Sequence, residues 1–134
     1  MDKIVYPAVF RPDECVGGYT VDFPDLLGCV TEGDTLHEAL YMASDALGLY
    51  LYTLKADKKP FPPATDPADI ETHGRDFTTL IEWDEEAYLR RTDNRSVKKT
   101  LTIPAWMDTL AREHNINFSQ LLQNAIRREC GMEA

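Results

Sequence analysis

The chain has 134 residues, of which 43% are hydrophobic and 28% are charged, a composition typical of a globular protein and not of a disordered one. No apolar run approaches the ~20 residues of a membrane-spanning helix, and the N-terminus lacks a basic segment followed by an apolar stretch. We therefore expect neither a membrane span nor a secretion signal. The 3 cysteines form no CxxC pair, and their odd count argues against a disulfide framework and predicts a cytoplasmic location.

The net charge of −9 is unevenly distributed along the chain. Residues 1–94 carry 8 Lys and Arg against 19 Asp and Glu, a balance of −11. Residues 95–134 carry 6 against 4, a balance of +2. An acidic body followed by a mildly basic tail predicts two modules with different partners, because opposite charges favour association.

Three short segments with strand-like patterns open the chain. Residues 4–10 form an apolar run that contains Pro7, and a proline inside a strand favours an edge position or a bulge. Residues 19–23 alternate apolar and polar side chains, and residues 29–32 follow after a tight connection at 24–28. Three short strands joined by brief connections predict an antiparallel meander.

A long helix and one further strand complete the first module. Thr35 and Glu38 form a capping-box pattern, and apolar residues at helical spacing follow, so we expect a helix of roughly twenty residues. Residues 56–76 are rich in proline and predict a loop, and residues 77–84 alternate as a fourth strand. The predicted class is α+β, with the order β-β-β-α-β over residues 1–89.

The last third of the chain predicts a strand followed by two helices. A polar linker at 90–96 precedes residues 97–104, in which apolar and polar side chains alternate. A helix follows, and Asn115 suits the left-handed residue that ends a helix when glycine is absent. Asn117 then begins a second helix, with Gln120 completing another capping-box pattern.

The strand at residues 97–104 needs a partner, because it is short and has one apolar face. The simplest partner is a second copy of the same strand. An antiparallel pair would place Lys98, Thr100 and Thr102 of both copies on one exposed face of a ribbon. A two-stranded ribbon fits the major groove of DNA, so we expect residues 97–134 to form a dimeric DNA-binding module.

The order strand, helix, turn and helix over residues 96–130 resembles the ribbon-helix-helix family of bacterial repressors. The resemblance implies that polar strand residues contact bases, and that the start of the second helix binds a backbone phosphate. The implied DNA-binding residues are Lys98, Lys99, Thr100, Thr102, Asn117 and Ser119. Two threonines on the strand offer less capacity to read bases than the Arg, Gln or Asn common in that family. A dimerisation ribbon that no longer binds DNA therefore stays open as an alternative.

The segment from Tyr19 to Ala39 carries a more specific signature, with YTVDFPDLLGC at 19–29 and GDTLHEA at 33–39. It is similar to the signature of HicB-type antitoxins, and with the helix and the last strand the resemblance covers residues 4–84. The resemblance implies a degenerate RNase H-like fold and a small basic ribonuclease toxin of the HicA type as partner. Most signature residues also have a folding role, since the glycines suit turns. The carboxylates that exceed what the turns require are the candidate toxin contacts, namely Asp22, Asp25, Glu32 and Asp34.

Catalysis is not expected. Two-metal nuclease chemistry needs carboxylates that converge from several elements, and the first predicted strand contains none. The 3 histidines lack the spacing of a zinc site, and neither a glycine-rich phosphate loop nor a serine elbow is present. We expect no catalytic residue, no metal and no cofactor.

The sequence as a whole predicts the antitoxin of a type II toxin–antitoxin pair. Residues 1–89 would neutralise the toxin, and residues 97–134 would dimerise and repress the pair's own operon. The resemblance to the ribbon-helix-helix family implies that two dimers bind adjacent half-sites. Two alternatives stay open. The chain could be a stand-alone ribbon-helix-helix repressor with a ligand-sensing N-terminal domain, or that domain could serve oligomerisation alone.

Overall fold

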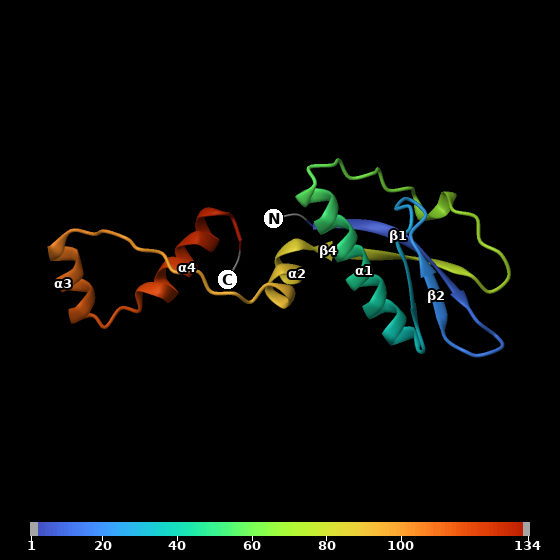
Figure 1. Cartoon of the computed structure of the whole chain (residues 1–134), viewed down its shortest axis with the longest axis horizontal. Helices are drawn as coiled ribbons and strands as arrows, with labels where there is room; N and C mark the ends of the chain where they lie inside the picture. Colours follow the sequence, from blue (N-terminus) through green and yellow to red (C-terminus); the bar gives the residue numbers. More distant parts are fainter. Residues whose placement is uncertain (1–2, 133–134) are drawn as a thin grey trace. The chain divides into compact units, whose positions relative to one another are not determined.

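The computed structural model describes residues 3–132, and the chain divides into two compact units, unit 1 (residues 1–95) and unit 2 (residues 96–134). Unit 1 contains most of the secondary structure, namely β1 (Lys3–Pro12), β2 (Tyr19–Asp22), β3 (Val30–Gly33), α1 (Leu36–Ala56), the short 3-10 helix η1 (Pro67–Asp69), β4 (Phe77–Asp84) and α2 (Glu85–Thr92). Unit 2 contains α3 (Ala105–Glu113) and α4 (Phe118–Glu129) (Figure 1). The predicted α+β class and the order β-β-β-α-β are confirmed.

The four strands form one antiparallel sheet with the order β3-β2-β1-β4. The first three strands pair in succession, with Val9 opposite Asp22 and Thr20 opposite Glu32, so the predicted meander is confirmed. The fourth strand returns along the free side of β1. Helix α1 lies across one face of this sheet (Figure 1).

Pro7 lies on a central strand, although proline was expected at an edge or a bulge. Strand β4 pairs with residues 3–10 of β1, whereas β2 pairs only with residues 9–12. At Pro7, β1 therefore pairs with β4 on one side only. No strand pairs with Pro7 on the other side, so the missing N–H of proline removes no hydrogen bond between strands there. The position is central in the sheet order but edge-like in its pairing.

The core of unit 1 lies between the sheet and α1. Alternate residues of β1, namely Tyr6, Ala8 and Phe10, are buried against the helix, and Phe10 stacks on Phe77 with ring centroids 5.2 Å apart. The helix contributes small and branched side chains at helical spacing, which are Ala39, Ala43, Leu47 and Leu51. Thr35 caps the helix by accepting a hydrogen bond from the Glu38 N–H at 3.1 Å, while Glu38 accepts one from the Asp34 N–H at 3.2 Å. The predicted capping box is therefore present.

Close backbone packing joins β3 to the start of α1. A Cβ atom built on Gly33 would lie 2.4 Å from the backbone nitrogen of Ala39. Such an approach is impossible for any residue with a side chain, so glycine at this position sets the distance between strand and helix.

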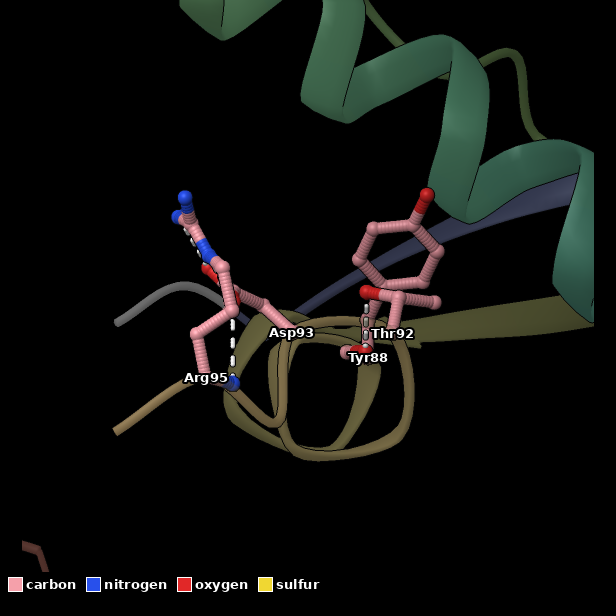
Figure 2. Close-up of polar contacts among 4 residues, drawn as sticks. All are labelled: Tyr88, Thr92, Asp93 and Arg95. Atoms are coloured by element: carbon pink, nitrogen blue, oxygen red, sulfur yellow. Dashed lines mark hydrogen bonds and ion pairs between the residues drawn. The ribbon is translucent and has the colours of Figure 1, made fainter.

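Helix α2 is fastened to α1 by two ion pairs and by aromatic contacts. Lys55 Nζ lies 2.6 Å from Glu85 Oε2, and Arg91 Nη2 lies 3.0 Å from Asp45 Oδ1. The Tyr88 ring points toward α1 (Figure 2), where it lies close over Gly48. These contacts attach α2 to the body of unit 1 along its whole length.

Helix α2 extends three residues into the segment expected as a linker, since it covers residues 90–92. At its end the Thr92 hydroxyl donates to the Tyr88 carbonyl oxygen at 2.8 Å, and the Arg95 guanidinium pairs with the Asp93 carboxylate at 2.8 Å (Figure 2). This Arg95 partner holds the pKa of the Asp93 carboxyl below its usual value. Residues 93–104 contain neither helix nor strand.

The predicted loop between α1 and β4 is confirmed, with η1 as its only regular element. Side chains of unit 1 hold it in place. The Tyr6 hydroxyl donates to the Pro62 carbonyl oxygen, and the Phe61 ring meets the Trp83 ring edge-on with centroids 6.0 Å apart. Asp66 caps the 3-10 helix by accepting a hydrogen bond from the Ala68 N–H. The long proline-rich segment is thus an ordered part of the fold.

Candidate functional site

The signature at 23–29 folds into two consecutive β-turns that present one leucine inward and the next outward. The Leu26 N–H donates to the Phe23 carbonyl oxygen, and the Cys29 N–H donates to the Leu26 carbonyl oxygen, both at 3.0 Å. Gly28 has φ +82°, the value that a type II turn requires at its third residue. Leu26 is fully buried, whereas Leu27 beside it is 93% exposed.

Cys29 is buried at the end of this turn, and burial raises the pKa of its thiol to about 11. Because only the thiolate reacts, about one molecule in a thousand would carry a reactive Cys29 at pH 8. We expect iodoacetamide to modify the exposed Cys15 and Cys130 in the native protein and to spare Cys29. Intact mass should show two adducts under native conditions and three in guanidinium chloride. Rapid addition of a third adduct to the native protein would contradict the burial of Cys29.

Two of the four predicted acidic contacts are engaged inside unit 1. The Asp22 carboxylate pairs with the Arg11 guanidinium, which also lies 3.4 Å from Asp76. The Asp25 carboxylate accepts hydrogen bonds from the backbone N–H and the hydroxyl of Thr65. Both carboxylates therefore stabilise the positions of strands and loop, and their oxygens are less available to a partner.

The other two acidic residues have exposed side chains on and just after β3, the edge strand beside β2. Glu32 lies on the edge strand β3, and Asp34 directly precedes the residue that caps α1. Within residues 3–132, neither carboxylate takes part in an ion pair or a side-chain hydrogen bond. These two carboxylates are accessible to a basic partner.

The predicted DNA-binding residues of the tail are all exposed. Lys98, Lys99, Thr100 and Thr102 lie in the extended segment before α3, which forms no strand in the single chain. A strand needs a hydrogen-bonded neighbour, so the ribbon stays a prediction. Asn117 and Ser119 lie at the start of α4.

The ends of the two tail helices follow the expected chemistry with one difference. Asn115 has φ +52° and follows the end of α3, as predicted for a left-handed residue. Asn117 caps α4 by accepting a hydrogen bond from the Gln120 N–H at 3.0 Å. The Gln120 side chain does not reach back to complete a capping box, because its amide donates to Asn124 Oδ1 at 3.0 Å. The N-cap of α4 therefore has the Asn117 hydrogen bond but not the reciprocal one from Gln120.

Unit 2 has almost no core of its own. Among its described residues 96–132, Ala111 is the only buried one. The apolar side chains of the extended segment and both helices are largely exposed, and they include Val97, Leu101, Ile103, Trp106, Leu110, Phe118, Leu121 and Ile126. Leu101, Ile103, Phe118 and their neighbours line a groove of about 420 Å³. An apolar surface of this extent on so small a unit is typical of an interface.

Neither a metal site nor a membrane span is found in the described part of the chain. Residues 3–132 contain no group of three or more His, Cys, Asp or Glu side chains that could hold a metal ion. No helix in that range is long and apolar enough to cross a membrane.

Comparison with known proteins decides the family. A model described as the HicB-like antitoxin of bacterial toxin-antitoxin systems matches residues 6–126, which is most of the chain. The chain belongs to this family. Its family is described as one of antitoxins of bacterial toxin-antitoxin systems.

Individual relatives agree with this assignment. The antitoxin is 46% identical over 59 residues to antitoxin HicB 1 of Photorhabdus laumondii, and 43% identical over 61 residues to antitoxin HicB 2 of the same organism. These matches cover 42% and 45% of this chain, but only 37% and 42% of the relatives' own lengths.

Solved structures share the fold over nearly the whole chain. A toxin–antitoxin complex from Streptococcus pneumoniae contains a chain with 30% identity and a TM-score of 0.61, matched over 96% of this antitoxin and 99% of that chain. The antitoxin HicB of Burkholderia pseudomallei has 18% identity and a TM-score of 0.54, with 92% and 96% covered. The second likeness shows the fold alone.

Proposed function

We propose that this antitoxin neutralises a HicA-type ribonuclease toxin through unit 1, and that two copies of unit 2 pair as a ribbon-helix-helix module that represses the operon. The assembly would act in the cytoplasm. The observation that carries the DNA-binding half is the exposed apolar surface of unit 2, in which Ala111 is the only buried residue among those described.

A second copy of unit 2 is the simplest cover for that surface. In the segment before α3, Leu101 and Ile103 line the apolar groove together with side chains of α4. Residues Lys98, Thr100 and Thr102 alternate with them, so a strand would turn these polar side chains to its opposite face. Pairing of two such segments would bury the apolar face and leave the polar face for the major groove.

The charge of unit 1 supports a basic protein partner. Residues 1–95 carry 9 Lys and Arg against 19 Asp and Glu, a balance of −10. Such a surface attracts a basic protein and makes the association faster at low salt. The matched chain from Streptococcus pneumoniae belongs to a structure of a toxin–antitoxin complex, which favours a toxin over a small ligand as the partner.

The DNA-binding half is tested by separating base contact from dimerisation. The triple variant Lys98→Ala, Thr100→Ala, Thr102→Ala should remain a dimer and bind its operator at least about 100-fold more weakly, because each lost base contact costs roughly 1–3 kcal/mol. Leu101→Asp should lose both the dimer and the operator, because it places a charge in the paired apolar face. Sedimentation and electrophoretic mobility shifts measure the two properties.

A charge-matched control is Lys58→Ala, which removes one positive charge from unit 1 and should leave the operator shift unchanged. If the triple variant shifts the operator as the unmodified antitoxin does, the ribbon does not read DNA. If Leu101→Asp stays a dimer, the groove in unit 2 is not the dimer contact.

The toxin-binding half is tested by co-expression with the small basic protein encoded beside the antitoxin. Unmodified antitoxin should co-purify with that protein and suppress its toxicity. Unchanged toxicity on co-expression would refute neutralisation and would favour a repressor that senses another ligand.

A further inference from the structure

A groove of about 400 Å³ runs between α1 and the edge of the sheet at β3. One wall consists of Gly28, Cys29 and Val30, and the other of α1 residues that include Leu49 and Thr53. Leu49 is 59% exposed, so an apolar side chain stands at the mouth of the groove. The Val30 side chain points to the sheet face away from α1, because Thr31 beside it pairs with the buried Val21 of β2. Exposed apolar side chains beside a concavity are typical of the centre of a protein interface.

Leu27 adds a second apolar side chain at the rim, just before Gly28. It occupies the second position of the type II turn, where the turn itself favours proline and needs no apolar side chain. The side chain is 93% exposed, and it therefore contributes almost nothing to the core of unit 1. Folding does not explain a leucine here, but contact with a partner does.

The rim of the groove is held in place before any partner arrives. The Tyr50 hydroxyl of α1 donates a hydrogen bond to the Leu27 carbonyl oxygen at 3.1 Å. Leu26 and Cys29, on either side of Leu27 and Gly28, are buried in the core. A preformed rim lowers the entropic cost of binding.

Charge decides between a second copy and a different protein as the occupant. Asp57 and Lys59 line the far end of the groove and balance each other in charge. A second copy would bring another unit of balance −10 against this one, whereas a basic protein would be attracted.

We propose that this groove is the docking site of the toxin, which inserts an apolar side chain between Leu27 and Leu49 while its basic residues face the acidic surface of unit 1. This inference rests on the proposed neutralisation of the toxin and places toxin binding at one edge of unit 1. Asp22 and Asp25 act in it as supports of the fold, because Arg11 and Thr65 already engage them.

The test uses the full-length antitoxin and the small basic protein encoded beside it. Leu27→Asp and Leu49→Asp should each weaken toxin binding at least about tenfold, as for a central interface residue. Leu80→Asp is the matched control. Leu80 is 52% exposed and precedes the buried Ile81 on β4, so its side chain lies on the sheet face away from α1. Leu80→Asp should change the affinity for the toxin less than about threefold.

Each outcome separates the docking site from the proposed function. All three variants should melt like the unmodified antitoxin, because the substituted side chains are exposed. If the unmodified antitoxin binds the toxin and only Leu80→Asp weakens that binding, the toxin occupies the sheet face away from α1, and the groove assignment is wrong. If the groove variants keep full affinity but change the sedimentation of the antitoxin, a second copy occupies the groove. If the unmodified antitoxin fails to bind, neutralisation and docking site are both refuted.

Discussion

Replacing Gly33 with alanine is expected to destabilise unit 1 by more than about 3 kcal/mol, at the upper end of single-residue effects. The new Cβ would lie 2.4 Å from the nitrogen and 2.6 Å from the Cα of Ala39, and 2.8 Å from the carbonyl carbon of Glu38. All three are backbone atoms at the start of α1, so no side-chain rotation relieves the overlap. The helix must move away from β3 and weaken the packing that both make with the core.

Gly48→Ala is the informative comparison for this variant. Its Cβ would also meet a neighbour at 2.6 Å, but that neighbour is the Tyr88 ring. The Tyr88 ring can rotate away from the new Cβ, which limits the cost of the overlap. Alanine also stabilises a helix by about 1 kcal/mol relative to glycine, so we expect the free energy of unfolding to fall by only about 1 kcal/mol. Guanidinium unfolding followed by circular dichroism gives both values. Equal losses would show that backbone proximity at Gly33 is not the decisive contact.

Lys55→Met is expected to lower the free energy of unfolding by about 2–3 kcal/mol, because it leaves a buried carboxylate without its cationic partner. Glu85 is 6% exposed, and both of its carboxylate oxygens lie 2.6 Å from Lys55 Nζ. Lys55 itself is half exposed, so water enters its place in part and keeps the loss toward the lower end of the range for buried pairs. Because Glu85 is the first residue of α2, that helix should loosen first.

A double-mutant cycle isolates the ion pair from the rest of the lysine side chain. Lys55→Met with Glu85→Leu should recover most of the lost stability, because no unpaired charge remains buried. Lys58→Met, which changes an exposed lysine just past the end of α1, is the control and should stay within about 0.5 kcal/mol of the unmodified antitoxin. If the double variant is as unstable as Lys55→Met, the lysine acts through packing and not through its charge.

Local sequence chemistry was sufficient to predict the elements of unit 1. The alternation at Tyr19 to Phe23, the capping pair Thr35 and Glu38, and the proline-rich loop each depend on residues close together in the chain. The docking of α2 could not be predicted in the same way. Lys55 and Glu85 are brought together by the sheet and the loop between them, and a sequence of 8 residues with low hydropathy gives no sign of burial.

The partners that two candidate toxin contacts have within unit 1 could not be predicted from the sequence. Asp22 and Asp25 are held by Arg11 and Thr65, which lie far from them in sequence and become neighbours only in the folded unit. Sequence alone treats such carboxylates like Glu32, which is accessible. The exposure of Leu27 has a signal in the sequence, because the adjacent Gly28 indicates a turn and turns lie at the protein surface.

The exposed apolar surface of unit 2 has a consequence for how the antitoxin responds to its own abundance. A module that gains its core only from a second copy is populated above the dissociation constant of that dimer and is lost on dilution. Unit 1 has its own core, so its fold does not depend on how many chains are present. Under the proposed function, repression should therefore fail first as the antitoxin becomes scarce, while the remaining single chains still capture toxin. The operon would then be transcribed again before neutralisation is lost.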